Sequence, residues 1–125
     1  MPDRPTTIAL GFSVADAERP ILELKGHSLT ICFPDWRGQT VVVAFDDTIA
    51  VRWQEAEYFF TTEERFDSTY VVEDSTWLDE HDKQAMTWTG SGHRHLKLNF
   101  NAAGVLEVLC TSVHVSTVSL SEKDP

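Results

Sequence analysis

This sequence has only two cysteines, no long apolar run and no basic N-terminus. Each of these features argues against a class of protein. The two cysteines, Cys32 and Cys110, are far apart and form no metal-binding or redox pair. No apolar run approaches the ~18–20 residues that cross a bilayer, and the chain start lacks the basic and strongly apolar parts of a secretory signal. We therefore expect a cytoplasmic protein with two buried, reduced thiols; a structural disulfide is the alternative.

Motifs for nucleophilic catalysis and phosphate binding are also missing. There is no G-x-S-x-G elbow, no cysteine beside a probable partner histidine, and no glycine-rich phosphate loop. Adjacent carboxylates occur at Asp46-Asp47, Glu63-Glu64 and Glu73-Asp74. Neighbours in an extended chain point to opposite faces, so these pairs do not form an acid–base dyad. We predict no catalytic residue and no cofactor, and a non-enzymatic protein.

The sequence contains enough apolar and aromatic residues for one hydrophobic core. Its 125 residues are 42% hydrophobic, with four Trp and seven Phe, which excludes disorder for most of the chain. We expect a single domain over residues 1–125, with loose tails at about 1–7 and 119–125.

The clearest local pattern is a β-hairpin over residues 93–110. Leu96, Leu98 and Phe100 alternate with polar residues, as in a half-buried strand. The segment Asn101-Ala-Ala-Gly104 is typical of a tight turn closed by glycine at positive φ. This turn predicts the pairs Phe100–Leu106, Leu98–Val108 and Leu96–Cys110. The opposite, solvated face would carry His95, Lys97, Asn99, Glu107 and Thr111.

Short apolar segments separated by turns continue through the chain. Strands are predicted near residues 8–14, 21–25, 28–33, 39–45, 48–54, 69–73 and 113–118, besides the hairpin. A helix capped by Asp74, Ser75 or Thr76 is expected to run to Gln84. The predicted fold is α+β: a mostly antiparallel sheet, or a β-rich roll, of seven to eight short strands with one short helix.

The net charge of −10 comes from one region. Twelve acids and two bases lie between Asp46 and Asp82, while the remaining residues balance. Such a surface repels phosphate, so nucleic acid is not an expected partner, and neither is a membrane. Within this region, segment 55–67 interleaves acids with aromatics and has two interpretations. Its aromatics are buried in the core, or they anchor a basic protein partner inside an acidic rim. The candidate partner-binding residues are Glu55, Glu57, Tyr58, Phe59, Phe60, Glu63, Glu64, Phe66 and Asp67.

Two stretches resemble a known group of proteins. Residues Tyr70-Val-Val-Glu-Asp-Ser-Thr-Trp-Leu78 and Arg94–Leu109, and more loosely Trp36-Arg-Gly38, are similar to a family of small, uncharacterised bacterial proteins. Some of its members resemble immunity proteins that bind and silence a toxin. The resemblance carries no catalytic residue and implies a binding protein. Our prediction is a non-enzymatic protein that occludes or sequesters a basic protein partner, such as a nuclease toxin.

The alternative is a small-ligand or metal-binding domain, with a possible enzymatic role, that uses His93 and His95. Alternation places both imidazoles on one strand face, and Glu107 is expected on the same hairpin face.

Overall fold

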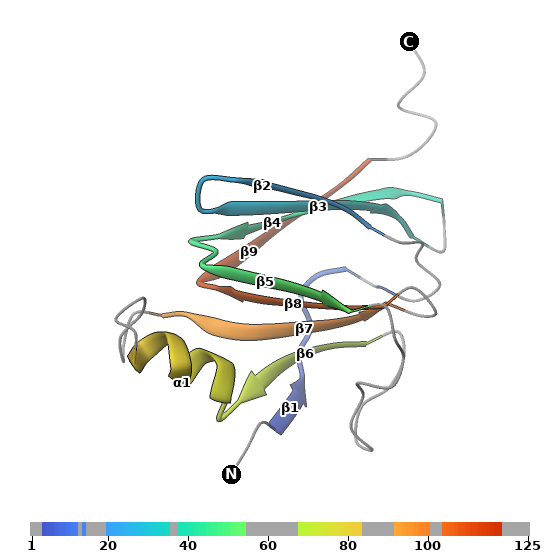
Figure 1. Cartoon of the computed structure of the whole chain (residues 1–125). Helices are drawn as coiled ribbons and strands as arrows, with labels where there is room; N and C mark the ends of the chain where they lie inside the picture. Colours follow the sequence, from blue (N-terminus) through green and yellow to red (C-terminus); the bar gives the residue numbers. More distant parts are fainter. Residues whose placement is uncertain are drawn as a thin grey trace.

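Two antiparallel β-sheets stack face to face in the computed structural model of the protein (Figure 1). The structure describes residues 4–12, 14, 20–35, 38–54, 68–83, 92–100 and 104–118; at positions 68, 82, 117 and 118 it describes the backbone only. In this part of the chain no helix is both long enough and apolar enough to cross a membrane.

Sheet B has four strands in the order β2-β3-β4-β9. They are β2 (Ile21–Lys25), β3 (Ser28–Pro34), β4 (Thr40–Asp46) and β9 (Ser112–Val118). In β3 and β4 every second residue is buried and the others are half-buried. This period of two is the one that the alternation of apolar side chains predicts, with one face against the core and the other toward solvent.

Sheet A has five strands in the order β1-β6-β7-β8-β5. They are β1 (Arg4–Thr7), β5 (Ala50–Gln54), β6 (Ser68–Glu73), β7 (Arg94–Phe100) and β8 (Gly104–Cys110). The helix α1 (Thr76–Lys83) lies on the side of this sheet that faces away from sheet B, next to β7 (Figure 1). Both faces of β7 and β8 are buried almost throughout.

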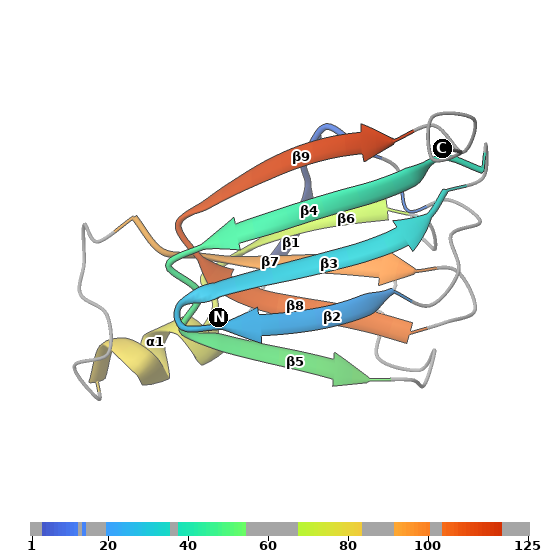
Figure 2. The same ribbon diagram turned by 90° about the horizontal axis from the view of Figure 1, so that it is seen from above.

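The hydrophobic core lies between the two sheets. Sheet A contributes mainly β7 and β8, and sheet B contributes β3 and β4. The rings of Phe33 and Phe100 meet across the layers edge to face, with centroids 5.2 Å apart. Edge-to-face contacts add to the free energy gained by burying the two rings. Seen from above, the strands of the two sheets run at a moderate angle to each other, as in aligned sandwiches (Figure 2).

The chain passes between the sheets at one end of the sandwich. After Asp46 ends β4, residues 47–49 lead into β5, and Thr111 alone separates β8 from β9. The amide of Thr111 donates to the Asp46 carbonyl at 3.0 Å, and the amide of Thr48 donates to the His27 carbonyl at 2.7 Å. Asp47 takes a positive φ of 51°, which Asp tolerates better than most residues. The bond from Thr111 to Asp46 joins the two crossings, and the bond from Thr48 to His27 joins the β4–β5 connection to the turn between β2 and β3.

The predicted antiparallel α+β class is confirmed, with two differences in the elements. The described residues form nine strands in two sheets, whereas the sequence predicted seven or eight. The N-terminal tail expected over residues 1–7 is shorter, because Arg4–Thr7 form β1 and pair with β6. The strand expected near residues 8–14 is not formed at Ile8–Phe12, which lie outside any strand. Pro5 is compatible with β1 because that strand is at the sheet edge.

The β7–β8 hairpin forms, but its predicted register is wrong by two residues. The observed pairs are Phe100–Gly104, Leu98–Leu106 and Leu96–Val108. Gly104 belongs to β8 rather than to the turn, so the loop is shorter than the pattern indicated. A slip of two residues keeps every side chain on its face. The apolar face therefore still meets the core.

The helix begins after Ser75, one of the three predicted N-cap residues. Ser75 precedes α1, and its hydroxyl oxygen accepts a hydrogen bond from the amide of Leu78 at 3.0 Å, which is the bond of an N-cap.

The two cysteines differ in burial, and both of their thiols are free. Cys110 is buried, and burial raises its pKa to about 12. Cys32 is only half-buried on the outer face of sheet B, so the expectation of two buried thiols holds for Cys110 alone.

Candidate functional site

Four polar side chains lie in one row across the outer face of sheet A. The strand registers place Tyr70 beside Lys97, Lys97 beside Glu107, and Glu107 beside Arg52. Tyr70, Lys97 and Glu107 are buried, and Arg52 reaches the surface. Two further residues of β7 on this face, His95 and Asn99, are also buried. The sequence predicted a solvated face here, and that prediction is wrong.

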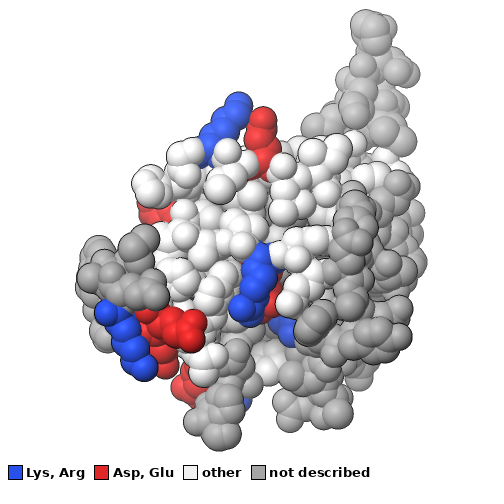
Figure 3. Space-filling view, viewed as in Figure 1, with Lys and Arg blue, Asp and Glu red and all other residues white. Residues whose placement is uncertain are grey.

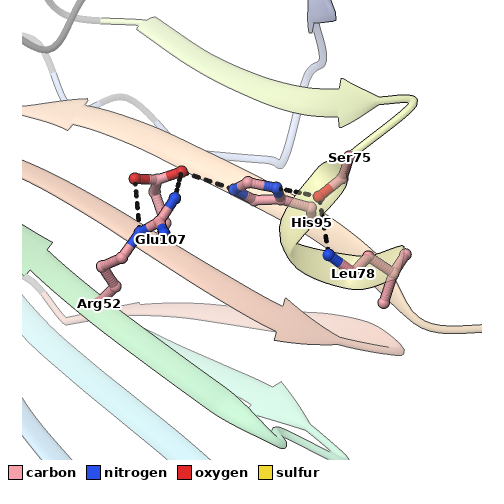
Figure 4. Close-up of polar contacts among 5 residues, drawn as sticks. All are labelled: Arg52, Ser75, Leu78, His95 and Glu107. Carbon is pink, nitrogen blue, oxygen red and sulfur yellow. Dashed lines mark hydrogen bonds and ion pairs between the residues drawn. The ribbon is translucent and has the colours of Figure 1, made fainter. Parts of the chain in front are cut away.

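A continuous chain of hydrogen bonds joins sheet A to α1 (Figure 4). Arg52 donates from Nε and Nη2 to the two oxygens of Glu107, at 3.1 and 3.0 Å. Oε1 of Glu107 also lies 2.6 Å from Nε2 of His95, and Nδ1 of His95 lies 2.7 Å from the Ser75 hydroxyl. We refer to Arg52, Glu107, His95 and Ser75 as the buried polar chain.

Glu107 is ionised within this chain. Burial by itself would raise its pKa, but hydrogen bonds and positive charge from His95 and Arg52 outweigh burial and lower the pKa to about 2. The two-bond fork from Arg52 is the geometry in which guanidinium and carboxylate pair most strongly. The negative charge of Glu107 is therefore matched inside the fold.

The carboxylate fixes the role of the His95 nitrogen that faces it. Glu107 can only accept, so Nε2 of His95 carries a proton and donates. Nδ1 pairs with the Ser75 hydroxyl, whose oxygen accepts from the Leu78 amide. Every group in the chain thereby has a donor–acceptor role that fits its neighbours.

Trp77 completes the packing between the helix and the sheet. Its ring meets His95 nearly edge to face, with centroids 5.2 Å apart. The guanidinium carbon of Arg52 lies 4.2 Å from the centre of the same ring, within cation–π range. The first turn of α1 is thus held by one polar contact, from Ser75, and one aromatic contact, from Trp77.

The order serine, histidine, carboxylate is also that of a catalytic triad, but the surroundings favour a structural role. Only 4% of Ser75 is exposed and 1% of His95, whereas a nucleophile must reach a substrate carbonyl. The described part of the chain has a pocket lined by Leu24, Gly26, His27 and residues 48–51, and the buried polar chain does not line it. We assign the buried polar chain to holding α1 on sheet A.

His93 and His95, the candidate ligands of the alternative function, have separate contacts. Nε2 of His93 lies 3.0 Å from the backbone oxygen of Asp47, while His95 belongs to the buried polar chain. The prediction that Glu107 shares a face with His95 is confirmed by their contact. Across the described ranges, no group of three or more His, Cys, Asp or Glu side chains is placed to hold a metal ion. Metal binding through these two histidines stays a prediction without support from the described geometry.

The predicted partner-binding residues, Glu55 to Asp67, all lie outside the described residues. The structure describes only the acidic residues on either side of this segment, at positions 46–47 and 73–80. Sequence reasoning placed His95 and Glu107 on one face but missed Ser75 and Arg52 as their partners. Ser75 was one of three candidate caps, with Asp74 and Thr76, while the pairing of β5 with β8 that brings Arg52 to Glu107 left no local signal.

Comparison with models of protein families, with curated proteins and with solved structures finds no match to this chain.

Proposed function

We propose that the protein is a non-enzymatic binding protein that occludes or sequesters a basic protein partner, in the manner of an immunity protein. The observation that carries this proposal is the gathering of acidic residues at one end of the sandwich, which we call the acidic end. Its described members come from the β4–β5 connection, the end of β6 and α1: Asp46, Asp47, Glu73, Asp74, Asp79 and Glu80.

The topology explains why these acids lie at the same end. β4 and β6 both finish there, and β7 starts there, because its His95 pairs with Val72 of β6. The contact of His93 with the Asp47 backbone links the start of β7 to the β4–β5 connection. Figure 1 shows α1 and these connections at one end, and Figure 3 shows acidic side chains with a basic one beside them in the region of α1.

Local contacts hold several of these acids without removing their charge from the surface. Arg4 pairs with Asp74 at 2.9 Å and with Glu73 at 3.7 Å. Asp46 accepts from His114 at 2.6 Å and from Ser112 at 2.9 Å. Exposed ion pairs contribute little free energy and orient carboxylates more than they neutralise them. Asp79 and Glu80 are exposed on α1, and the sequence between Asp46 and Asp82 carries ten net negative charges.

A surface of this kind favours a basic partner through the rate of association. Opposite charges steer two proteins together and like charges reject wrong partners, over a range of about 8 Å at physiological salt. A nuclease toxin exposes basic residues where it binds nucleic acid, and an acidic protein that covers them would silence it. The resemblance of two stretches to a family of small bacterial proteins, some of which resemble immunity proteins, supports the same kind of partner.

The first test is affinity capture from native lysate at low and high salt, followed by mass spectrometry. We expect a basic protein that is retained at low salt and released as salt rises. An acidic partner, or a partner retained equally at both salt concentrations, would contradict the electrostatic proposal.

The second test reverses charge at the acidic end in the isolated pair. Asp79→Lys with Glu80→Lys should slow association about tenfold and flatten its dependence on salt. The control is Glu122→Lys with Asp124→Lys, which changes the net charge equally but at the end of the chain. Association rates are measured by stopped-flow or surface plasmon resonance. If both double variants slow association by the same factor, total charge matters and the acidic end is not the docking surface.

A further inference from the structure

Strand β2 has one edge that pairs with no other strand in the described part of the chain, and three of its five residues are apolar. It is the first strand in the order of sheet B and pairs with β3 along its other edge. The large hydrophobic side chains that the structure describes as exposed are all in β2, with Ile21 73% and Leu24 59% accessible, and Leu22 the third. Folded proteins normally protect such edges with charge, proline or a covering segment, because an open edge can pair with another strand.

The register shows how this edge is oriented. Leu22 and Leu24 pair with the core residues Ile31 and Leu29, so they lie on the inner face of sheet B. A two-residue turn, Gly26-His27, joins Lys25 to Ser28, and Gly26 has a φ of 58°. In such a hairpin the flanking pair exchanges hydrogen bonds, and the pattern alternates from there. The N–H and C=O groups of Leu22 and Leu24 therefore point away from β3.

A pocket adjoins this edge. It has a volume of about 340 Å³ and is lined by Leu24, Gly26 and His27 from sheet B and by residues 48–51 from sheet A. In Figure 2, β5 reaches beyond β2 on this side of the sandwich. The pocket thus has a strand edge as its wall and the start of β5 as its floor. A strand added beside β2 would pass this pocket at Leu24.

We propose that an extended segment of a basic protein partner adds to β2 as a further strand of sheet B and places an apolar side chain in this pocket. The inference rests on the proposed function, because it names the docking mode of the same partner. Strand addition uses backbone hydrogen bonds for affinity and alternate side chains for specificity.

Two observations select this occupant over a second copy of the chain. In Figure 2, β5 lies beyond β2, so two copies joined edge to edge at β2 would each bring a β5 strand to the join. One short strand also buries less area than the roughly 1,200 Å² of a stable interface, so the segment belongs to a larger partner that makes further contacts. The nearby acidic end, reached through Asp47 beside the pocket residue Thr48, supplies the complementary charge for that partner.

The geometry also defines the chemistry of the segment. Side chains of the added segment that lie beside Leu22 and Leu24 on the inner face should be apolar, of the size of Val, Ile or Leu. Those on the outer face lie next to Glu23 and Lys25, which contact each other at 3.8 Å and are both exposed. Because the whole chain carries −10, Lys or Arg opposite Glu23 is favoured. The expected segment alternates apolar with polar or basic residues.

The test uses a phage-displayed library of random peptides selected on the full chain. We expect selected peptides to alternate apolar and basic residues, and a synthetic copy to lose at least tenfold in affinity when its alternate amides are N-methylated. Leu24→Lys should weaken binding at least tenfold, because it places a charge in the apolar pocket. Ile21→Lys is the matched control: it is the same change on the same strand, but on the outer face, and should preserve binding.

A second measurement does not depend on the variants. Addition of the peptide should slow hydrogen exchange at the Leu22 and Leu24 amides, while that at Ile21 stays unchanged. Peptides without alternation, no selected peptide, or equal binding to Leu24→Lys and wild type would overturn the inference. So would peptide binding without protection of the Leu22 and Leu24 amides.

Failure of this inference is distinguishable from failure of the proposed function. If the captured partner depends on Asp79 and Glu80 but binds Leu24→Lys normally, only the strand-addition mode is wrong. If alternating peptides bind at β2 but the captured partner ignores charge reversal at the acidic end, the proposed function is wrong and the β2 site remains.

Discussion

The outer faces of the two sheets look alike in sequence and differ in the structure. In sheet B, the outer residues of β3 and β4, such as Thr30 and Ala44, are half-buried and follow an ordinary alternation. In sheet A, outer residues of β7 and β8, including His95, Lys97 and Glu107, are buried, with at most 8% of each exposed. The difference teaches that a polar residue at every second position does not by itself show a solvated face.

The two faces also satisfy their polar groups in different ways. A residue on a half-buried face can exchange hydrogen bonds with water, whereas a buried group needs a partner from the protein. Glu107 is hydrogen-bonded to Arg52 and His95, and His95 is hydrogen-bonded to Ser75. Buried polar groups with complete partners favour a single arrangement, because any other packing leaves a charge unmatched.

The largest difference in stability between the two sheets is expected when a glycine in each is substituted. A Cβ on Gly104, at the start of β8, would lie 2.5 Å from the Gln54 carbonyl oxygen and 2.6 Å from Cζ2 of Trp53, and φ is 150°. Gly104→Val should lower the free energy of unfolding by at least about 4 kcal/mol, since a backbone oxygen cannot move aside. Urea unfolding followed by tryptophan fluorescence measures it.

The control for that prediction lies in sheet B. Gly26 also has a positive φ, 58°, but a Cβ there would meet nothing within 4 Å. Gly26→Ala should therefore cost only the conformational term, about 1 kcal/mol. Equal losses for Gly104→Val and Gly26→Ala would show that close approach of β5 to β8 is not what requires Gly104.

A smaller effect is expected from neutralising the buried carboxylate of sheet A. Glu107→Gln leaves Arg52 and His95 without their anion and should destabilise the fold by about 3 kcal/mol at pH 7. Thr30→Val, on the half-buried outer face of sheet B, should change stability by less than about 0.5 kcal/mol. If Glu107→Gln leaves the free energy of unfolding unchanged, the outer face of sheet A tolerates substitution as well as the outer face of sheet B does.

The same carboxylate predicts the acid response of wild type. The pKa of Glu107 falls from 4.5 to about 2 on folding, so folding favours its ionised form. The stabilisation is complete above the unfolded pKa and is lost as pH falls from about 4.5 toward 2; this shift is worth about 3 kcal/mol. Urea midpoints of wild type and Glu107→Gln should therefore converge as pH decreases over that range. A constant gap between them would refute the linkage.

The smallest effect concerns the thiols, one in each sheet. Cys110 faces the core of sheet A with a pKa raised to about 12, while Cys32 is half-buried on the outer face of sheet B. Thiolate is the reactive species, so a thiol reagent at neutral pH should label Cys32 first and Cys110 only as the protein unfolds. Mass spectrometry of Cys32→Ser and Cys110→Ser reads each site separately. Faster labelling of the Cys32→Ser variant than of Cys110→Ser would contradict the burial difference.

Local patterns predicted most elements but not their long-range partners. The alternation around Leu29 and Ile31, the turn at Gly26-His27 and the cap at Ser75 are each specified within a few residues. The hairpin register was wrong because two pairings that differ by two residues place the same side chains inward. In the observed register Gly104 lies close to Gln54 and Trp53, which come from a strand distant in sequence.

Side-chain period, turn chemistry and composition are enough to predict the antiparallel α+β class, which hairpin residues share a face, the region where the helix starts and the regional negative charge. They do not predict that β7 and β8 are buried on both faces, or that Arg52, Glu107, His95 and Ser75 meet. Nor do they predict that β2 is an outermost strand of sheet B in the described part of the chain. Burial and contact depend on which strands become neighbours, and that choice is made by the whole chain at once.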